Sequence, residues 1–181
     1  MKTGREVGVR LTELMCDTST VADNAATWAR ARVGSTSYAT RCLAFVEDAI
    51  ERANGIEIFG GDDAHESAVR YDAHTRAGDA LPPAGALVFY DSVSIIGGQR
   101  RNWGHVGMSL GDGAIIHAWD RVRIDDLRAV EQLAPPPGGE PLSFVGWVPL
   151  SRVLEGAVPK AYDDDPANAA VRAQRERFGS T

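Results

Sequence analysis

The sequence contains few cysteines, no long apolar run and no excess of basic residues. Only two of its 181 residues are cysteine, too few for a disulfide framework, so we expect both as thiols. No segment approaches the roughly 20 apolar residues of a membrane-spanning helix, and the N-terminal segment lacks an apolar run of secretory length. The formal net charge of −6 comes without a basic stripe. We therefore expect no membrane or nucleic acid as a partner, and a cytoplasmic protein, with signal-independent export as an effector as the other route.

The composition is typical of one globular domain. Hydrophobic residues make up 44% of the chain and charged residues 24%, which is enough apolar material for a core. We predict an N-terminal segment over residues 1–19, a folded domain over 20–159 and a polar tail over 160–181. The sequence sets no oligomeric state.

Periodicity predicts helices first and strands afterwards. Apolar residues at helical spacing predict helices over 20–33 and 41–53, and residues 60–79 allow a short polar helix. Short runs rich in Val, Ile and aromatic residues predict strands at 85–92, 105–110, 114–119, 121–124 and 144–150. Residues 94–102 and 134–141 read as surface loops. This order predicts an α+β fold, with the helices packed on a central antiparallel sheet.

Cys42 is the first candidate for chemistry. It falls near the start of the predicted helix 41–53, where unpaired backbone N–H groups and the helix dipole favour an anion. Arg41 adds a positive charge, so we expect a lowered pKa for the thiol and a thiolate nucleophile. The structural alternative is a small core residue, which is the usual role of a free cysteine on an apolar helix face.

Two histidines supply possible partners for Cys42. In "GHVGMSLGDGAIIHAW", residues 104–119, a three-residue turn over 111–113 pairs Leu110 with Ala114. This register sets His105 opposite Trp119 and His117 opposite Gly107, so that the two histidines share one face. His105 can then act as a base toward Cys42 while His117 orients it.

Metal binding is the alternative use of these residues. Cys42, His105 and His117 could supply three zinc ligands with an open fourth position. No short metal-ligand spacing accompanies them, and the acidic stretch around His65 and His74 reads as a solvated helix face. We therefore expect no metal and no cofactor.

Three phrases carry a resemblance to a known family. "YATRCLAFV", "LPPAGALVFYD" and "NWGHVGMSLGDGAIIHAW" resemble the NlpC-type, papain-like cysteine peptidases that cut peptidoglycan stem peptides, a group related to the CHAP amidases. The resemblance spans roughly residues 22–150. It implies a papain-like fold in which Cys42 is the nucleophile and His105 and His117 complete the site. It also implies that Tyr38 contacts substrate.

The chain departs from this family next to the nucleophile. Family members usually read Asp-Cys-Ser-Gly, whereas this chain has Arg41, then Leu43 and Ala44 after Cys42. The arginine suggests a substrate that presents a carboxylate or phosphate, and the two apolar residues make the pocket bulkier.

Two tryptophans and an insertion complete the expected site. Trp103 and Trp119 flank the histidine strands and are expected to line the substrate cleft, with core or rim packing as the alternative. Residues 92–103 look like an insertion beside the site.

These observations predict a cysteine hydrolase that cleaves an amide or peptide bond through a thioester intermediate. The expected substrate is a peptidoglycan-type peptide or a small cytosolic amide. One alternative is an acyltransferase or amide-forming enzyme of a biosynthetic pathway, since an amine can resolve a thioester as well as water can. Another is a catalytically inactive binding module that keeps the fold.

Overall fold

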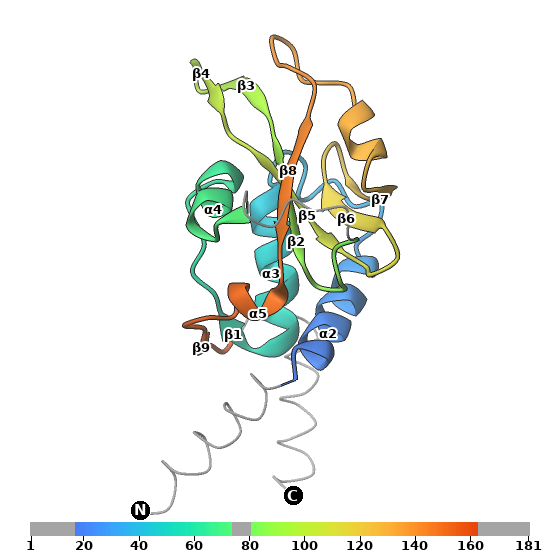
Figure 1. Cartoon of the computed structure of the whole chain (residues 1–181), viewed down its shortest axis with the longest axis vertical. Coiled ribbons are helices and arrows are strands. Elements are labelled where there is room, and N and C mark those ends of the chain that lie inside the picture. The colour runs from blue at the N-terminus through green and yellow to red at the C-terminus, as the bar shows by residue number, and fades with distance from the viewer. Residues whose placement is uncertain (1–16, 74–80, 163–181) are drawn as a thin grey trace, which may run out of the picture.

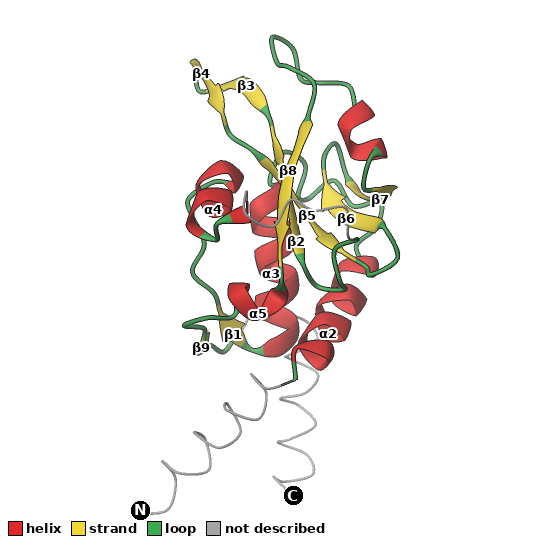
Figure 2. Cartoon of the chain, viewed as in Figure 1, coloured by secondary structure: helices red, strands yellow, loops and turns green. Residues whose placement is uncertain are grey.

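The computed structural model describes residues 17–73 and 81–162 (Figure 1). The helices in these residues are α2 (Thr18–Arg30), α3 (Cys42–Asn54), α4 (Ala64–Arg70), α5 (Leu150–Val153) and the 3-10 helix η2 (Ala129–Gln132). The strands are β1 (Ile56–Glu57), β2 (Leu87–Asp91), β3 (Val93–Ile96), β4 (Gln99–Asn102), β5 (His105–Ser109), β6 (Ala114–Ala118), β7 (Val122–Asp126), β8 (Ser143–Val148) and β9 (Val158–Pro159). Figure 2 distinguishes the helices, strands and loops by colour.

A five-stranded sheet is the centre of the fold. Its strand order is β7-β6-β5-β2-β8, and every neighbouring pair is antiparallel. β1 pairs with β9, and β3 pairs with β4, in two separate two-stranded sheets. The larger helices precede the sheet in sequence, so the predicted α+β class with a central antiparallel sheet is confirmed.

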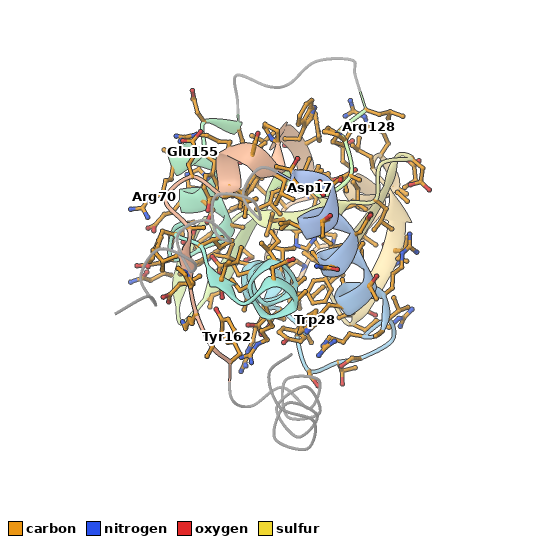
Figure 3. All side chains as sticks on the ribbon, turned by 90° about the horizontal axis from the view of Figure 1, so that it is seen from below. Asp17, Trp28, Arg70, Arg128, Glu155 and Tyr162 are labelled. Carbon is orange, nitrogen blue, oxygen red and sulfur yellow. The ribbon has the colours of Figure 1, made fainter. Side chains whose placement is uncertain are left out.

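The two long helices have clear local causes. Asp17 caps α2 by accepting hydrogen bonds from the backbone N–H groups of Ser19 and Thr20, and Figure 3 shows Asp17 and Trp28 toward opposite ends of this helix. α3 ends at Gly55, whose φ of 64° is the left-handed conformation that glycine adopts without strain. Each helix buries one stripe of apolar residues, as the sequence spacing predicted.

The sheet has a buried core on each face. One face packs under α2 and α3, through Phe45, Val46 and Val106 among others. The opposite face packs through Val88, Tyr90 and Ile115 against the connection that contains η2. The central strands are therefore buried on both sides, which makes the sheet a rigid base for any side chain at its edge.

The prediction of a loop at 94–102 is wrong. β3 and β4 form a hairpin there, and its turn residues Gly97 and Gly98 both have positive φ, at 59° and 80°. A Gly-Gly pair between two short runs is a two-residue hairpin signal. In Figure 1 this hairpin and the irregular segment 134–141 project beyond the same end of the sheet.

Within the described residues, no helix is both long and apolar enough to cross a membrane. Cys16, His74 and residues 163–181 of the predicted tail lie outside the described residues. The domain boundaries at 19–20 and 159–160 stay predictions.

Candidate active site

Cys42 is the first residue of α3, and the backbone before it is held in an unusual shape. Thr40 has a φ of 63°, which is rare for a β-branched residue. Its N–H donates to the carbonyl oxygen of Trp119 at 3.0 Å, and Arg41 takes the N-cap position with no capping side-chain hydrogen bond. The turn before Cys42 is thereby tied to the end of β6.

The thiol of Cys42 lies beside the start of β5. α3 packs on β5 and β6, and the backbone N–H of Val106 is hydrogen-bonded to the Cys42 sulfur. Val106 follows His105 directly, so the fold brings Cys42 and His105 together across 63 positions of sequence (105 − 42 = 63).

The two histidines contact each other as their register predicted. Gly107 pairs with His117, and the N–H of Leu110 donates to the carbonyl oxygen of Ala114 at 2.9 Å. Nε2 of His105 then lies 2.9 Å from Nδ1 of His117 in a buried hydrogen bond. The predicted hairpin is confirmed, and both imidazoles are almost completely buried.

Gly107 provides the room for this contact. A Cβ atom at Gly107 would lie 2.4 Å from Cγ2 of Ile115 and 3.0 Å from Cβ of His117. Any larger residue would push His117 away, because the opposing strand cannot retreat inside a packed sheet.

Asp125 adds a carboxylate to the row of side chains that starts with Cys42, His105 and His117. Nε2 of His117 lies 3.0 Å from Oδ2 of Asp125 on β7. Asp125 is in turn bound by Arg123, whose Nε and Nη2 donate to its two oxygens at 2.5 and 3.1 Å. The resulting order is Cys42, His105, His117, Asp125, Arg123.

Asp125 was not among the predicted site residues, because the predicted strand 121–124 ends one residue before it, whereas β7 continues to Asp126. The signal was present in the β6–β7 hairpin, where Ala118 pairs with Val122 and His117 with Arg123. Side chains two residues apart on a strand share a face, so Asp125 stands diagonal to His117 on the side of Arg123.

Burial decides the protonation of the catalytic candidates. It raises the pKa of the Cys42 thiol to about 11, although the backbone N–H groups of Val106, Leu43 and Cys42 act in the opposite direction. Burial also lowers the pKa of His105 well below its usual value, helped by the neighbouring His117. The expectation of a low thiol pKa is therefore wrong in its net direction. Cys42 is therefore a thiol and His105 a neutral imidazole at pH 7, and the two are called the neutral pair below.

We expect the alkylation of Cys42 to report this neutral pair. In a Cys16→Ser background, the iodoacetamide rate should rise steadily from pH 7 to pH 10, because the thiolate fraction grows toward a pKa of about 11. The measurement is the rate of adduct formation by intact mass. Leu43→Ala is a useful comparison, since it opens the apolar surroundings and should raise the rate at pH 8.

A rate that is already constant between pH 6 and pH 8 would contradict the neutral pair. It would mean a thiolate–imidazolium pair like the one that helix position alone predicts. Cys42→Ala in the same background gives the signal of non-specific alkylation.

The residues predicted to bind substrate lie in different surroundings. Arg41 is exposed beside Cys42, and its contact with substrate stays a prediction. Trp119 is half-buried, with its ring perpendicular to that of His105 at a centroid distance of 5.0 Å. Its indole therefore packs against the His105 imidazole. Tyr38 donates its hydroxyl to Asp48 at 2.6 Å, and its ring packs against Trp28 and Phe45. In this arrangement Tyr38 is a packing residue, and its contact with substrate stays a prediction.

Trp103 belongs to the insertion. Its indole N–H donates to the carbonyl oxygen of Ser94 at 3.1 Å, and the guanidinium of Arg101 lies 3.6 Å above its ring centre. Arg101 also pairs with Asp63 at 2.5 Å. The negative charge of Asp63 makes a small contribution to the raised pKa of Cys42, whose main cause is burial. The β3–β4 hairpin thus brings a stacked arginine to the edge of the site.

The hydrogen bonds of the two histidines occupy nitrogens that a zinc ion would need as ligands. Nε2 of His105 and Nδ1 of His117 face each other in a hydrogen bond, and Nε2 of His117 faces Asp125. Both nitrogens of His117 are therefore occupied. Among residues 17–73 and 81–162, no three His, Cys, Asp or Glu side chains are grouped as metal ligands.

The chain matches the model of a known protein family. The family model described as NlpC/P60 matches residues 32–132, a span that contains Cys42, both histidines and Asp125. No curated protein matches the chain.

Proposed function

Because the chain belongs to the NlpC/P60 family, whose members are in general cysteine peptidases and amidases, we propose that it hydrolyses an amide or peptide bond at Cys42. One observation carries this proposal. His105 starts the strand beside the Cys42 thiol and is bonded through Nε2 to His117. A nucleophile, a base and an orienting group in contact are the requirement of covalent acyl-transfer chemistry.

The reaction follows from the neutral pair. Sγ of Cys42 attacks the carbonyl carbon of the substrate while its proton passes to Nδ1 of His105, the ring nitrogen that His117 leaves open. Collapse of the tetrahedral adduct breaks the C–N bond, and His105 returns the proton to the leaving amine. Water then attacks the thioester with His105 as base, which releases the acid and restores the Cys42 thiol.

The start of α3 supplies a donor for the developing oxyanion. The first N–H groups of a helix have no partner within it, and those of Cys42 and Leu43 are near the sulfur. We assign the Cys42 N–H to this role, because such preorganised donors stabilise the charge that forms during attack.

The substrate that suits this site carries a carboxylate near the cleaved bond. Arg41 is exposed next to Cys42 and its side chain caps no backbone group of α3, so it is available for a charged partner. A guanidinium binds carboxylates in a two-pronged contact. A stem-peptide fragment or a small N-acyl amino acid has this chemistry.

A screen of defined amides tests the proposal. The wild-type chain is incubated with stem-peptide fragments and N-acyl amino acids, each as free carboxylate and as carboxamide, and products are read by mass spectrometry. We expect cleavage of the free carboxylates, and Arg41→Gln is expected to raise their KM about tenfold with little effect on the carboxamides. Arg128→Gln is the matched control, because Arg128 is exposed beside η2, on the face of the sheet opposite to α3.

Other outcomes point to the alternative functions. A product that forms only when an amine acceptor is added would overturn hydrolysis in favour of acyl transfer. Binding of a peptide without cleavage, equal in the wild type and in Cys42→Ala, would indicate an inactive binding module.

A further inference from the structure

Asp125 is the least expected member of the row of side chains behind Cys42. Only 17% of its side chain is exposed, and it receives three hydrogen bonds, two from Arg123 and one from His117. Burial raises the pKa of its carboxyl, but the hydrogen bonds from Arg123 and His117 outweigh burial, so the pKa is lowered overall. Asp125 is therefore a carboxylate at neutral pH, able only to accept hydrogen bonds.

An acceptor-only group at this position determines where the protons of both histidines lie. Burial lowers the pKa of His117, so its imidazole is neutral and carries one proton. Since Asp125 cannot donate, that proton is on Nε2, and Nδ1 is left as an acceptor. Nε2 of His105 faces that acceptor and must then be protonated. The proton-free nitrogen of His105 is consequently Nδ1.

We propose that Asp125 is a positioning residue that sets the tautomers of His117 and His105, and thereby keeps Nδ1 of His105 free to accept the Cys42 proton. The use of that nitrogen in catalysis rests on the proposed function, whereas the tautomers themselves do not. Arg123 anchors the carboxylate by a two-pronged contact and is itself held by Asp120 at 3.4 Å.

Removal of the carboxylate should reverse both tautomers. The guanidinium of Arg123 binds the same carboxylate oxygen as Nε2 of His117, and in Asp125→Ala this guanidinium can only donate. Nε2 then becomes the acceptor, Nδ1 of His117 takes the proton, and His105 must protonate Nδ1 to keep the bond between the rings. The base toward Cys42 is lost although neither Cys42 nor His105 is substituted.

The test is the side-chain ¹⁵N spectrum of the histidines at pH 7.5, where each tautomer has its own nitrogen shifts. In the wild type we expect Nε2–H on both His105 and His117. In Asp125→Ala we expect the Nδ1–H form of both, and in Asp125→Glu, which keeps a carboxylate, the wild-type form. Asp126→Asn is the matched control, because Asp126 is exposed on the same strand and accepts from the N–H of Arg128.

Activity gives a second, separate readout. On the substrate found in the amide screen, Asp125→Ala should lower kcat about 10²-fold or more at nearly unchanged KM, and Asp125→Glu should restore part of it. Wild-type spectra with Nδ1–H on His105, or tautomers that stay the same in Asp125→Ala, would overturn the inference even if the chain is a hydrolase. Conversely, a chain without turnover but with the expected tautomers would refute the proposed function and leave the role of Asp125 in place.

Discussion

Cys42→Ala is expected to reduce amide hydrolysis by at least about 10⁴-fold, because no other group in the row can form the thioester. His105→Ala should cost a similar factor. Without a base, the thiol of the half-buried Cys42, with a pKa of about 11, has no acceptor for its proton during attack. The measurement is kcat/KM on the substrate identified by the amide screen.

His117→Ala should have a smaller effect, a loss of about 10²-fold, since it leaves His105 in place but free to turn. Residual activity in Cys42→Ala above a tenth of wild type would rule out Cys42 as the nucleophile. Cys16→Ser is the matched control, because it removes the other thiol and should keep full activity. An unchanged circular dichroism spectrum of Cys42→Ala would show that the variant is folded, so that its loss of activity comes from the missing thiol.

Gly104→Ala is expected to give the largest loss of stability, about 2–4 kcal/mol of the free energy of unfolding. Gly104 has a φ of 69° and precedes His105 directly. A Cβ there would lie 2.4 Å from the backbone nitrogen of His65 at the start of α4. That helix cannot easily move, since the N–H of His65 donates to the carbonyl oxygen of Trp103 at 3.1 Å. The variant should also lose activity, because any relief of the clash displaces His105.

Gly98→Ala separates the clash from the cost of the backbone conformation. Gly98 has a φ of 80° with no atom within 4 Å of a Cβ at that position, so its substitution should cost only about 1 kcal/mol. Urea unfolding of both variants measures the difference. Equal losses in the two variants would show that α4 does not press on Gly104.

The β5–β6 hairpin and the helix start at Cys42 could be predicted because local rules govern them. A three-residue turn with glycine at both ends determines the pairing of its flanking strands, and the two-residue alternation of a strand then decides which side chains share a face. The contact between His105 and His117 follows from these rules. The β3–β4 hairpin is also determined by neighbouring residues, because its Gly-Gly turn marks a two-residue hairpin, although a loop was predicted there.

The contact of His117 with Asp125 could not be predicted from neighbouring residues. It depends on the pairing of β6 with β7 across a turn at 119–121 that has no glycine to mark it. The partner of Tyr38 likewise required α3 to be in place, since Asp48 is the seventh residue of that helix.

The sequence alone determined the chemical types, their order along the chain and the face on which the histidines meet, because each of these depends on neighbours within a few residues. Only the tertiary structure decided the protonation of Cys42. The helix start favours a thiolate, as its backbone N–H groups show, but the packing of α3 against β5 and β6 desolvates the half-buried Cys42 enough to raise the pKa of its thiol. Desolvation is a property of everything that surrounds a group, and no stretch of sequence contains that information.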